Sequence, residues 1–81
     1  MSLEVQKIAS FIRNWLTNQL QQEVGQDAEF AGLGLDSLDV VRLTDELAEH
    51  IGVDELPVAL VLEHPTVSSL ASHLATLPGA R

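Results

Sequence analysis

Aliphatic side chains recur at steps of three and four along most of this chain, the spacing of one face of an α-helix. The first such run covers residues 3–23 and is made of Val5, Ile8, Ile12, Trp15, Leu16 and Leu20, with Phe11 on the flank. Polar residues fill the opposite face, and Gly25 is the expected stop. Residues 3–23 are therefore predicted to form a long amphipathic helix.

A second helix is predicted over residues 37–51. Its core stripe is Val40, Leu43, Leu47 and Ile51. Asp36 is a good N-cap, because its carboxylate accepts N–H groups of the first turn, and Asp39 adds negative charge where the helix dipole favours it. Gly52 is the expected end. The capping residues and the hydrophobic periodicity therefore predict the same bounds for this helix.

The apolar segment at 57–63 is predicted to be a short third helix or turn. Pro57 suits a first helical position, and the run 58–62 is expected to pack inward. A short buried strand is the alternative, which periodicity does not exclude. Helix is favoured because a lone strand would have no sheet partner.

A final helix should follow Thr66 as its cap. Its inner face is made of Val67, Leu70, Ala71, Leu74 and Leu77, and Pro78-Gly79 closes it. Residues 24–35 form a long loop, pinned to the core by Phe30, Leu33 and Leu35, with Gly32 and Gly34 at its turns. The fold class is all-α: a small four-helix bundle with three longer helices, one short third helix and a long first loop.

Size and charge limit what this bundle can do. Its 81 residues are expected to form a single domain, 1–81, with an ordered core of about 3–77, too small for a deep cleft. Net charge is −8, and residues 23–63 hold 11 acids against one base, Arg42. This balance argues against nucleic acid or an anionic membrane as partner and favours partners with basic surfaces.

Other absences set further expectations. The chain has no cysteine, which excludes disulfides and is compatible with a cytoplasmic location. No signal peptide is recognised at the start, and a monomer is expected. The initial methionine fits a free-standing protein, although an excised domain would look the same.

Ser37 is the residue that most directly suggests a chemistry. It stands at the mouth of the second helix, directly after a glycine-containing loop, and no base is beside it in sequence. An anion attached there would meet unpaired N–H groups and the positive end of the helix dipole. A serine displayed in this way suits modification by another protein's active site. The simpler alternative is that Asp36 and Ser37 only cap the helix.

Catalytic and metal sites are less well supported. Ser37 with His50 could suggest a hydrolase, but thirteen residues of helix would separate them by roughly 20 Å. Glu46, Glu49 and His50 are spread over a solvated face. The spacing of His50, His64 and His73 matches no standard metal site. No catalytic residue and no metal ligand are expected.

The segment 33–39, Leu-Gly-Leu-Asp-Ser-Leu-Asp, resembles the phosphopantetheine attachment site of acyl carrier proteins. The segment 56–67, with its His-Pro-Thr run, and the positions Leu70, Ala71, His73 and Leu74 resemble carrier domains of modular polyketide synthases. The resemblance covers essentially the whole chain. It implies a carrier that has no catalytic activity of its own.

The resemblance also implies a site and partners. A phosphopantetheinyl transferase, using coenzyme A and Mg²⁺, would join 4′-phosphopantetheine to Ser37, and the arm would carry acyl groups as thioesters. Acyl-loading and synthase or transferase enzymes with basic docking surfaces would then read the start and the exposed face of the second helix. The partner-recognition residues implied are Asp36, Leu38, Asp39, Arg42, Asp45, Glu46 and Glu49.

Two departures shape the expected pathway. Arg42 stands where fatty-acid carriers usually have an acid, and Asp45 where they often have an apolar residue. A polyketide or specialised fatty-acid pathway is therefore expected. The alternatives are a peptidyl or aryl carrier, and a non-enzymatic acidic helical adaptor that never carries a prosthetic group.

Overall fold

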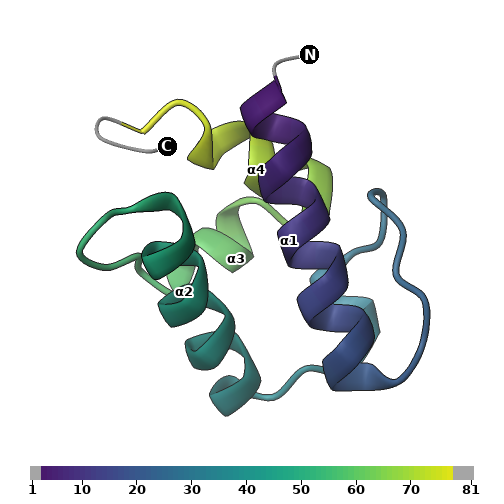
Figure 1. Ribbon diagram of the computed structural model, residues 1–81. Helices are drawn as coiled ribbons and strands as arrows, with labels where there is room; N and C mark the ends of the chain where they lie inside the picture. Colours follow the sequence, from purple (N-terminus) through teal and green to yellow (C-terminus); the bar gives the residue numbers. More distant parts are fainter. Residues whose placement is uncertain (1–2, 78–81) are drawn as a thin grey trace.

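The computed structural model describes residues 3–77, which form four α-helices, one 3₁₀ helix and no strand (Figure 1). The elements are α1 (Leu3–Leu20), η1 (Phe30–Leu33), α2 (Ser37–Ile51), α3 (Ala59–Glu63) and α4 (Val67–Leu74). The predicted all-α bundle with a short third helix and a long first loop is confirmed. No helix in the described part of the chain is long and apolar enough to span a bilayer.

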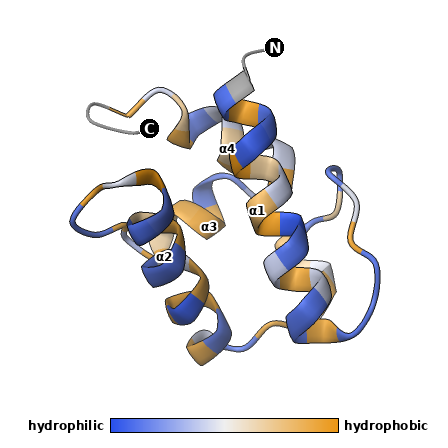
Figure 2. Ribbon diagram, in the orientation of Figure 1, coloured by the Kyte–Doolittle hydropathy of each residue, from blue (hydrophilic) through white to orange (hydrophobic). Residues whose placement is uncertain are grey.

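The core lies where α1 meets α4 and α2. Figure 2 shows hydrophobic and hydrophilic residues alternating around the helices, as amphipathic packing requires. The side chains excluded from solvent most completely are aliphatic: Ile8, Ile12, Leu16, Leu43, Leu47, Ile51, Val67, Leu70 and Leu74. These are positions that the period of three and four assigned to the core.

The end of α1 differs from the prediction. The helix stops at Leu20 instead of residue 23, and Gly25 is not its cap. Gln21 takes a left-handed backbone conformation with φ of 57°. Its side-chain amide donates to the Asn18 carbonyl at 2.7 Å, which satisfies a helix-end acceptor. Arg13 Nε then donates to the Val24 carbonyl at 3.0 Å and turns the chain back along α1.

The loop after α1 is fastened to the start of α4. The Phe30 N–H donates to the Pro65 carbonyl at 2.8 Å, and Glu29 forms an isolated antiparallel bridge with Thr66. Phe30 is buried, as predicted. Gly34 follows η1 with φ of 77°, a conformation that glycine adopts without strain. These contacts and the turn at Gly34 therefore fix the direction in which the chain enters α2.

Helix α2 occupies the predicted residues, 37–51. The Asp36 carboxylate accepts the Asp39 N–H, and the Asp39 carboxylate accepts the Asp36 N–H, which together make a capping box. Gly52 ends the helix with φ of 85°, and its N–H donates to the Ala48 carbonyl. Both ends are thus set by residues next to the helix in sequence.

The third segment is a helix, as favoured over a strand, but it begins at Ala59 instead of Pro57. The expected inward packing of the run 58–62 is wrong for most of it. Only Val61 is buried, whereas Leu62 is 83% exposed and Val58 is 46% exposed. A helix of little more than one turn presents apolar side chains in all directions, and only one side of α3 meets the core.

Helix α4 begins after Thr66, whose side chain accepts the Ser69 N–H in a second capping box. It ends at Leu74, earlier than the predicted Leu77, and the chain continues in hydrogen-bonded turns. Leu77 still packs partly against the core, as expected for the inner face. Pro78-Gly79, the predicted terminator, lies outside the described residues.

Candidate functional site

Ser37 is the first residue of α2, and its side chain is exposed. The capping box around it fixes the local backbone, because the Asp39 N–H donates to Asp36 Oδ1 at 2.8 Å. The Val40 N–H is bonded to the Asp36 carbonyl at 3.1 Å. No hydrogen bond to a described residue engages the N–H groups of Ser37 and Leu38 or the Ser37 hydroxyl. These groups are free to receive an attached anion.

An apolar hollow adjoins Ser37 between α2 and α3. Its volume is about 250 Å³, and it is lined by Leu35, Asp36, Ser37, Val40, Val58, Val61 and Leu62. A second hollow of about 190 Å³ shares Leu35, Val40, Val61 and Leu62 with the first and extends to Phe30, Ala31 and Pro65. The exposed positions of α3 thus form one wall beside the serine. Sequence reasoning missed this wall because it expected α3 to turn those residues inward.

The outward face of α2 carries four of the predicted recognition residues. Leu38 is 57% exposed, and Arg42, Asp45 and Glu49 are also exposed. Val41, 41% exposed, lies beside them and was not predicted. No ion pair or side-chain hydrogen bond within the described residues engages Arg42, Asp45 or Glu49. This face therefore combines apolar surface with free charges of both signs.

Asp39 and Glu46, also predicted to recognise partners, are placed differently. They lie on the side of α2 that faces α1, and each already accepts a hydrogen bond from it. Trp15 Nε1 donates to Glu46 Oε2 at 2.6 Å, and Gln19 Nε2 donates to Asp39 Oδ1 at 3.1 Å. Trp15, expected in the core, is half-buried at this junction instead. The repeat of Trp15 and Gln19 at i and i+4 was the only sequence signal for these contacts.

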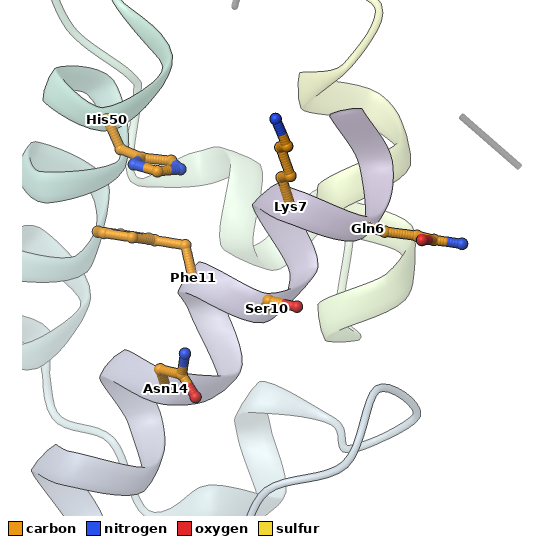
Figure 3. Close-up of a pocket in the computed structure, with 6 residues that line it drawn as sticks. All are labelled: Gln6, Lys7, Ser10, Phe11, Asn14 and His50. Atoms are coloured by element: carbon orange, nitrogen blue, oxygen red, sulfur yellow. The ribbon is translucent and has the colours of Figure 1, made fainter. Parts of the chain in front are cut away.

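His50 also contacts α1, at the far end of α2 from Ser37. Its ring stacks on that of Phe11, with centroids 4.2 Å apart and planes 14° apart (Figure 3). An open hollow of about 530 Å³ beside this pair is lined by Gln6, Lys7, Ser10, Phe11, Asn14 and His50. His50 is thus part of the contact between helices and is not placed to act on Ser37.

The two other histidines pair with each other. His64, just after α3, and His73, on α4, stack with ring centroids 4.2 Å apart. Stacked rings do not converge on a shared point as metal ligands must. Over residues 3–77, no group of three or more His, Cys, Asp or Glu side chains could hold a metal ion.

The family of phosphopantetheine attachment sites matches residues 7–74 of the chain. The chain belongs to this family. It is a carrier domain, and membership implies a covalently attached 4′-phosphopantetheine group. The surroundings of Ser37 fit such a group, since they offer an exposed hydroxyl, two unbonded N–H groups for a phosphate and an apolar hollow for the arm.

Relatives place the chain among the carrier domains of large synthases. It is 51% identical over 51 residues to the erythronolide synthase EryA3 of Saccharopolyspora erythraea, covering 63% of this chain and 2% of that protein. It is 37% identical over 76 residues to the atromentin synthetase greA of Suillus grevillei, covering 94% of this chain and 8% of that protein. The chain therefore spans less than a tenth of the length of these relatives.

A solved structure shows the same helical arrangement. BlmI, a type-II acyl-carrier protein from Streptomyces verticillus involved in bleomycin biosynthesis, superposes with a TM-score of 0.79. The two are 25% identical, and the match covers 88% of this chain and 86% of BlmI. The α-helical fold of carrier proteins is thus found over most of both chains.

Proposed function

We propose that this chain carries acyl intermediates for polyketide or related specialised fatty-acid synthesis, and that Ser37 is its attachment residue. The observation that carries the proposal is the placement of the Ser37 hydroxyl. It is exposed at the start of α2, makes no hydrogen bond to residues 3–77, and lies next to an apolar hollow. The 51% identity to a segment of erythronolide synthase supports a polyketide-type pathway.

Each part of this site has a task in the proposed function. Ser37 supplies the hydroxyl oxygen of the phosphodiester. The N–H groups of Ser37 and Leu38, with the helix dipole, stabilise the negative charge of that diester. When bound, the prosthetic group supplies a terminal thiol that holds acyl groups as thioesters. The hollow between α2 and α3 offers apolar surface next to the attachment point.

We infer that the chain is not itself an enzyme. No hydrogen bond joins the Ser37 hydroxyl to another described side chain, so nothing in this part of the chain activates it as a nucleophile. His50 is stacked on Phe11 at the other end of α2. The base and the Mg²⁺ needed for modification would come with a separate phosphopantetheinyl transferase. These 81 residues are proposed to form one monomeric domain, and the absence of cysteine among them is compatible with a cytoplasmic location.

Synthase and transferase partners are proposed to dock on the outward face of α2. This face, together with the surrounding loops, carries most of the acids of a chain with net charge −8. Partners with basic surfaces would be steered toward it. The exposed Leu38 and Val41 add apolar contact area, and Arg42 adds one positive charge within the face.

Intact mass spectrometry tests the attachment directly. The chain is incubated with coenzyme A, Mg²⁺ and a broad-specificity phosphopantetheinyl transferase. We expect a gain of one phosphopantetheine, mapped to Ser37, and no gain in Ser37→Ala. The variant should unfold at the same urea concentration as the parent, because Ser37 is exposed and its side chain has no hydrogen-bond partner in the described part of the chain. Modification of Ser37→Ala would refute Ser37 as the attachment residue.

The same assay separates the alternative functions. A folded, unmodified chain that gains no mass would favour the acidic adaptor, which needs no prosthetic group. If the chain is modified, a panel of acyl-activating and aminoacyl-activating enzymes then distinguishes an acyl cargo from an amino acid or aryl acid. Loading by the acyl-activating enzymes alone is the expected result.

A further inference from the structure

Three contacts between α1 and α2 lie in one row, here called the α1–α2 seam. It consists of the pairs Phe11–His50, Trp15–Glu46 and Gln19–Asp39. The three α1 residues are four positions apart, so they share one face of their helix. The pairing of Phe11 with the end of α2 and of Gln19 with its start shows that the two helices run antiparallel (Figure 1).

The Gln19–Asp39 pair differs from the other two pairs because Asp39 belongs to the capping box around Ser37. Both carboxylate oxygens of Asp39 are used: Oδ1 accepts from Gln19 Nε2 at 3.1 Å, and Oδ2 accepts from the Asp36 N–H at 3.3 Å. The Asp39 N–H in turn donates to Asp36 Oδ1 at 2.8 Å. A chain of hydrogen bonds therefore runs from α1 through Asp39 to the residue before Ser37.

We propose that Gln19 is a positioning residue for the modification of Ser37. It acts through Asp39, by holding the Asp39 carboxylate in the orientation that closes the capping box around Ser37. This inference rests on the proposed function, since it concerns the presentation of the attachment serine. Gln19 does not line the hollow beside Ser37, and its side-chain hydrogen bond goes to Asp39, so its effect on Ser37 is proposed to pass through Asp39.

The physical basis is a restriction of motion. The start of a helix frays readily, and a capping box reduces fraying by satisfying two N–H groups at once. Both Asp36 and Asp39 are near water, so their carboxylates have competing partners. The hydrogen bond from Gln19 on α1 lowers the number of conformations that the Asp39 side chain samples. Ser37 then meets a modifying enzyme in one backbone conformation, and less conformational entropy is lost on binding.

Two substitutions at position 19 test the role. Gln19→Met keeps the length of the side chain and removes the donor, whereas Gln19→Lys restores a donor to Asp39. Asn18→Ala is the matched control, because the Asn18 side chain is exposed and the hydrogen bond from Gln21 goes to the backbone carbonyl of Asn18, which alanine keeps. The readouts are the exchange of the Asp36 and Asp39 amides with water by NMR, and kcat/KM for modification by a phosphopantetheinyl transferase with coenzyme A.

In Gln19→Met we expect amide exchange to accelerate and kcat/KM to fall, each by roughly two- to fivefold, the size of one lost hydrogen bond. Gln19→Lys should restore slow amide exchange, and it should restore kcat/KM at roughly 0.5 M salt, where its added charge is screened from the partner. Asn18→Ala should change neither quantity. The urea midpoint should stay close to that of the parent in all three, because the affected N–H groups lie at the start of α2, which opens locally without global unfolding.

Unchanged amide exchange in Gln19→Met would overturn the inference, as would faster exchange with an unchanged rate of modification. A parent chain that is never modified is a different outcome. It would refute the proposed function itself, and with it the role of Gln19. Because exchange is measured on the unmodified protein, the two failures are distinguishable.

Discussion

At the residue scale, the same residue type has different roles on two sides of α2. Asp45 and Glu49 point outward and are unbonded, whereas Glu46 accepts the Trp15 indole N–H. Acids spaced along a helix look alike in sequence, and only the position of α1 separates them. A substitution at Glu46 therefore affects stability as well as surface charge, while one at Asp45 affects surface charge alone.

The Trp15–Glu46 hydrogen bond can be measured on its own. Trp15→Phe removes the donor and Glu46→Ala the acceptor; each should lower the free energy of unfolding by about 0.5–1.5 kcal/mol. A double-mutant cycle isolates the coupling between them. Trp15 is the only tryptophan, so Glu46→Ala should also shift its fluorescence in the folded state. A coupling energy of zero would show that the contact contributes nothing in solution.

At the element scale, the two sides of α3 have opposite environments. Val61 is 5% exposed and faces the core, whereas Leu62 next to it is 83% exposed. We expect Val61→Ala to destabilise the protein by about 1–3 kcal/mol through lost burial and a residual cavity. Leu62→Ala should stay within about 0.5 kcal/mol of the parent, although it removes more carbon atoms. Urea titrations of both variants check the pair.

Equal losses in Val61→Ala and Leu62→Ala would contradict this orientation of α3. They would mean that the run 58–62 packs inward, as the sequence pattern suggested, whereas a loss of stability in Leu62→Ala alone would mean that Leu62 faces the core in place of Val61. The exposed Leu62 also lines the hollow beside Ser37. Its substitution should therefore alter the environment of an attached arm without unfolding the protein.

The elements differ in how far they could be predicted. Both ends of α2 were correct because Asp36 and Gly52 give local signals for a start and a stop. The end of α1 was missed because Gln21, not glycine, takes the left-handed conformation, and a contact distant in sequence, from Arg13 to Val24, fixes the chain after it. The α1–α2 seam was also missed because of contacts distant in sequence: pairs such as Gln19–Asp39 depend on the relative position of two helices.

At the scale of the whole molecule, charge is distributed unevenly. Residues 23–63 hold 11 of the 12 acids and one base, Arg42, and this stretch includes the loop, α2 and α3. Helix α4 has no Asp, Glu, Lys or Arg, and the described part of α1 has one acid and two bases. The acids closest to Ser37 in sequence, Asp36 and Asp39 at the start of α2, belong to this stretch, whose negative charge would draw a basic partner.

Charge reversal separates a local docking role for Asp45 from a general effect of this field. Asp45 lies on the outward face of α2, whereas Asp54 lies in the loop after α2, away from Ser37. Asp45→Lys and Asp54→Lys each change the formal net charge by the same two units, from −8 to −6. We expect Asp45→Lys to lower kcat/KM for modification at low salt several-fold and Asp54→Lys to lower it much less. The difference should shrink between low and roughly 0.5 M salt as screening grows.

Stability measurements complete the comparison. Both variants should unfold within about 0.5 kcal/mol of the parent, because neither acid is bonded within the described residues. Equal rate losses in the two variants would mean that only net charge steers the partner. No loss in either would argue that Leu38, Val41 and the attachment loop dominate recognition. A loss confined to Asp45→Lys would place the docking contact on the outward face of α2, beside the seam that holds this helix against α1.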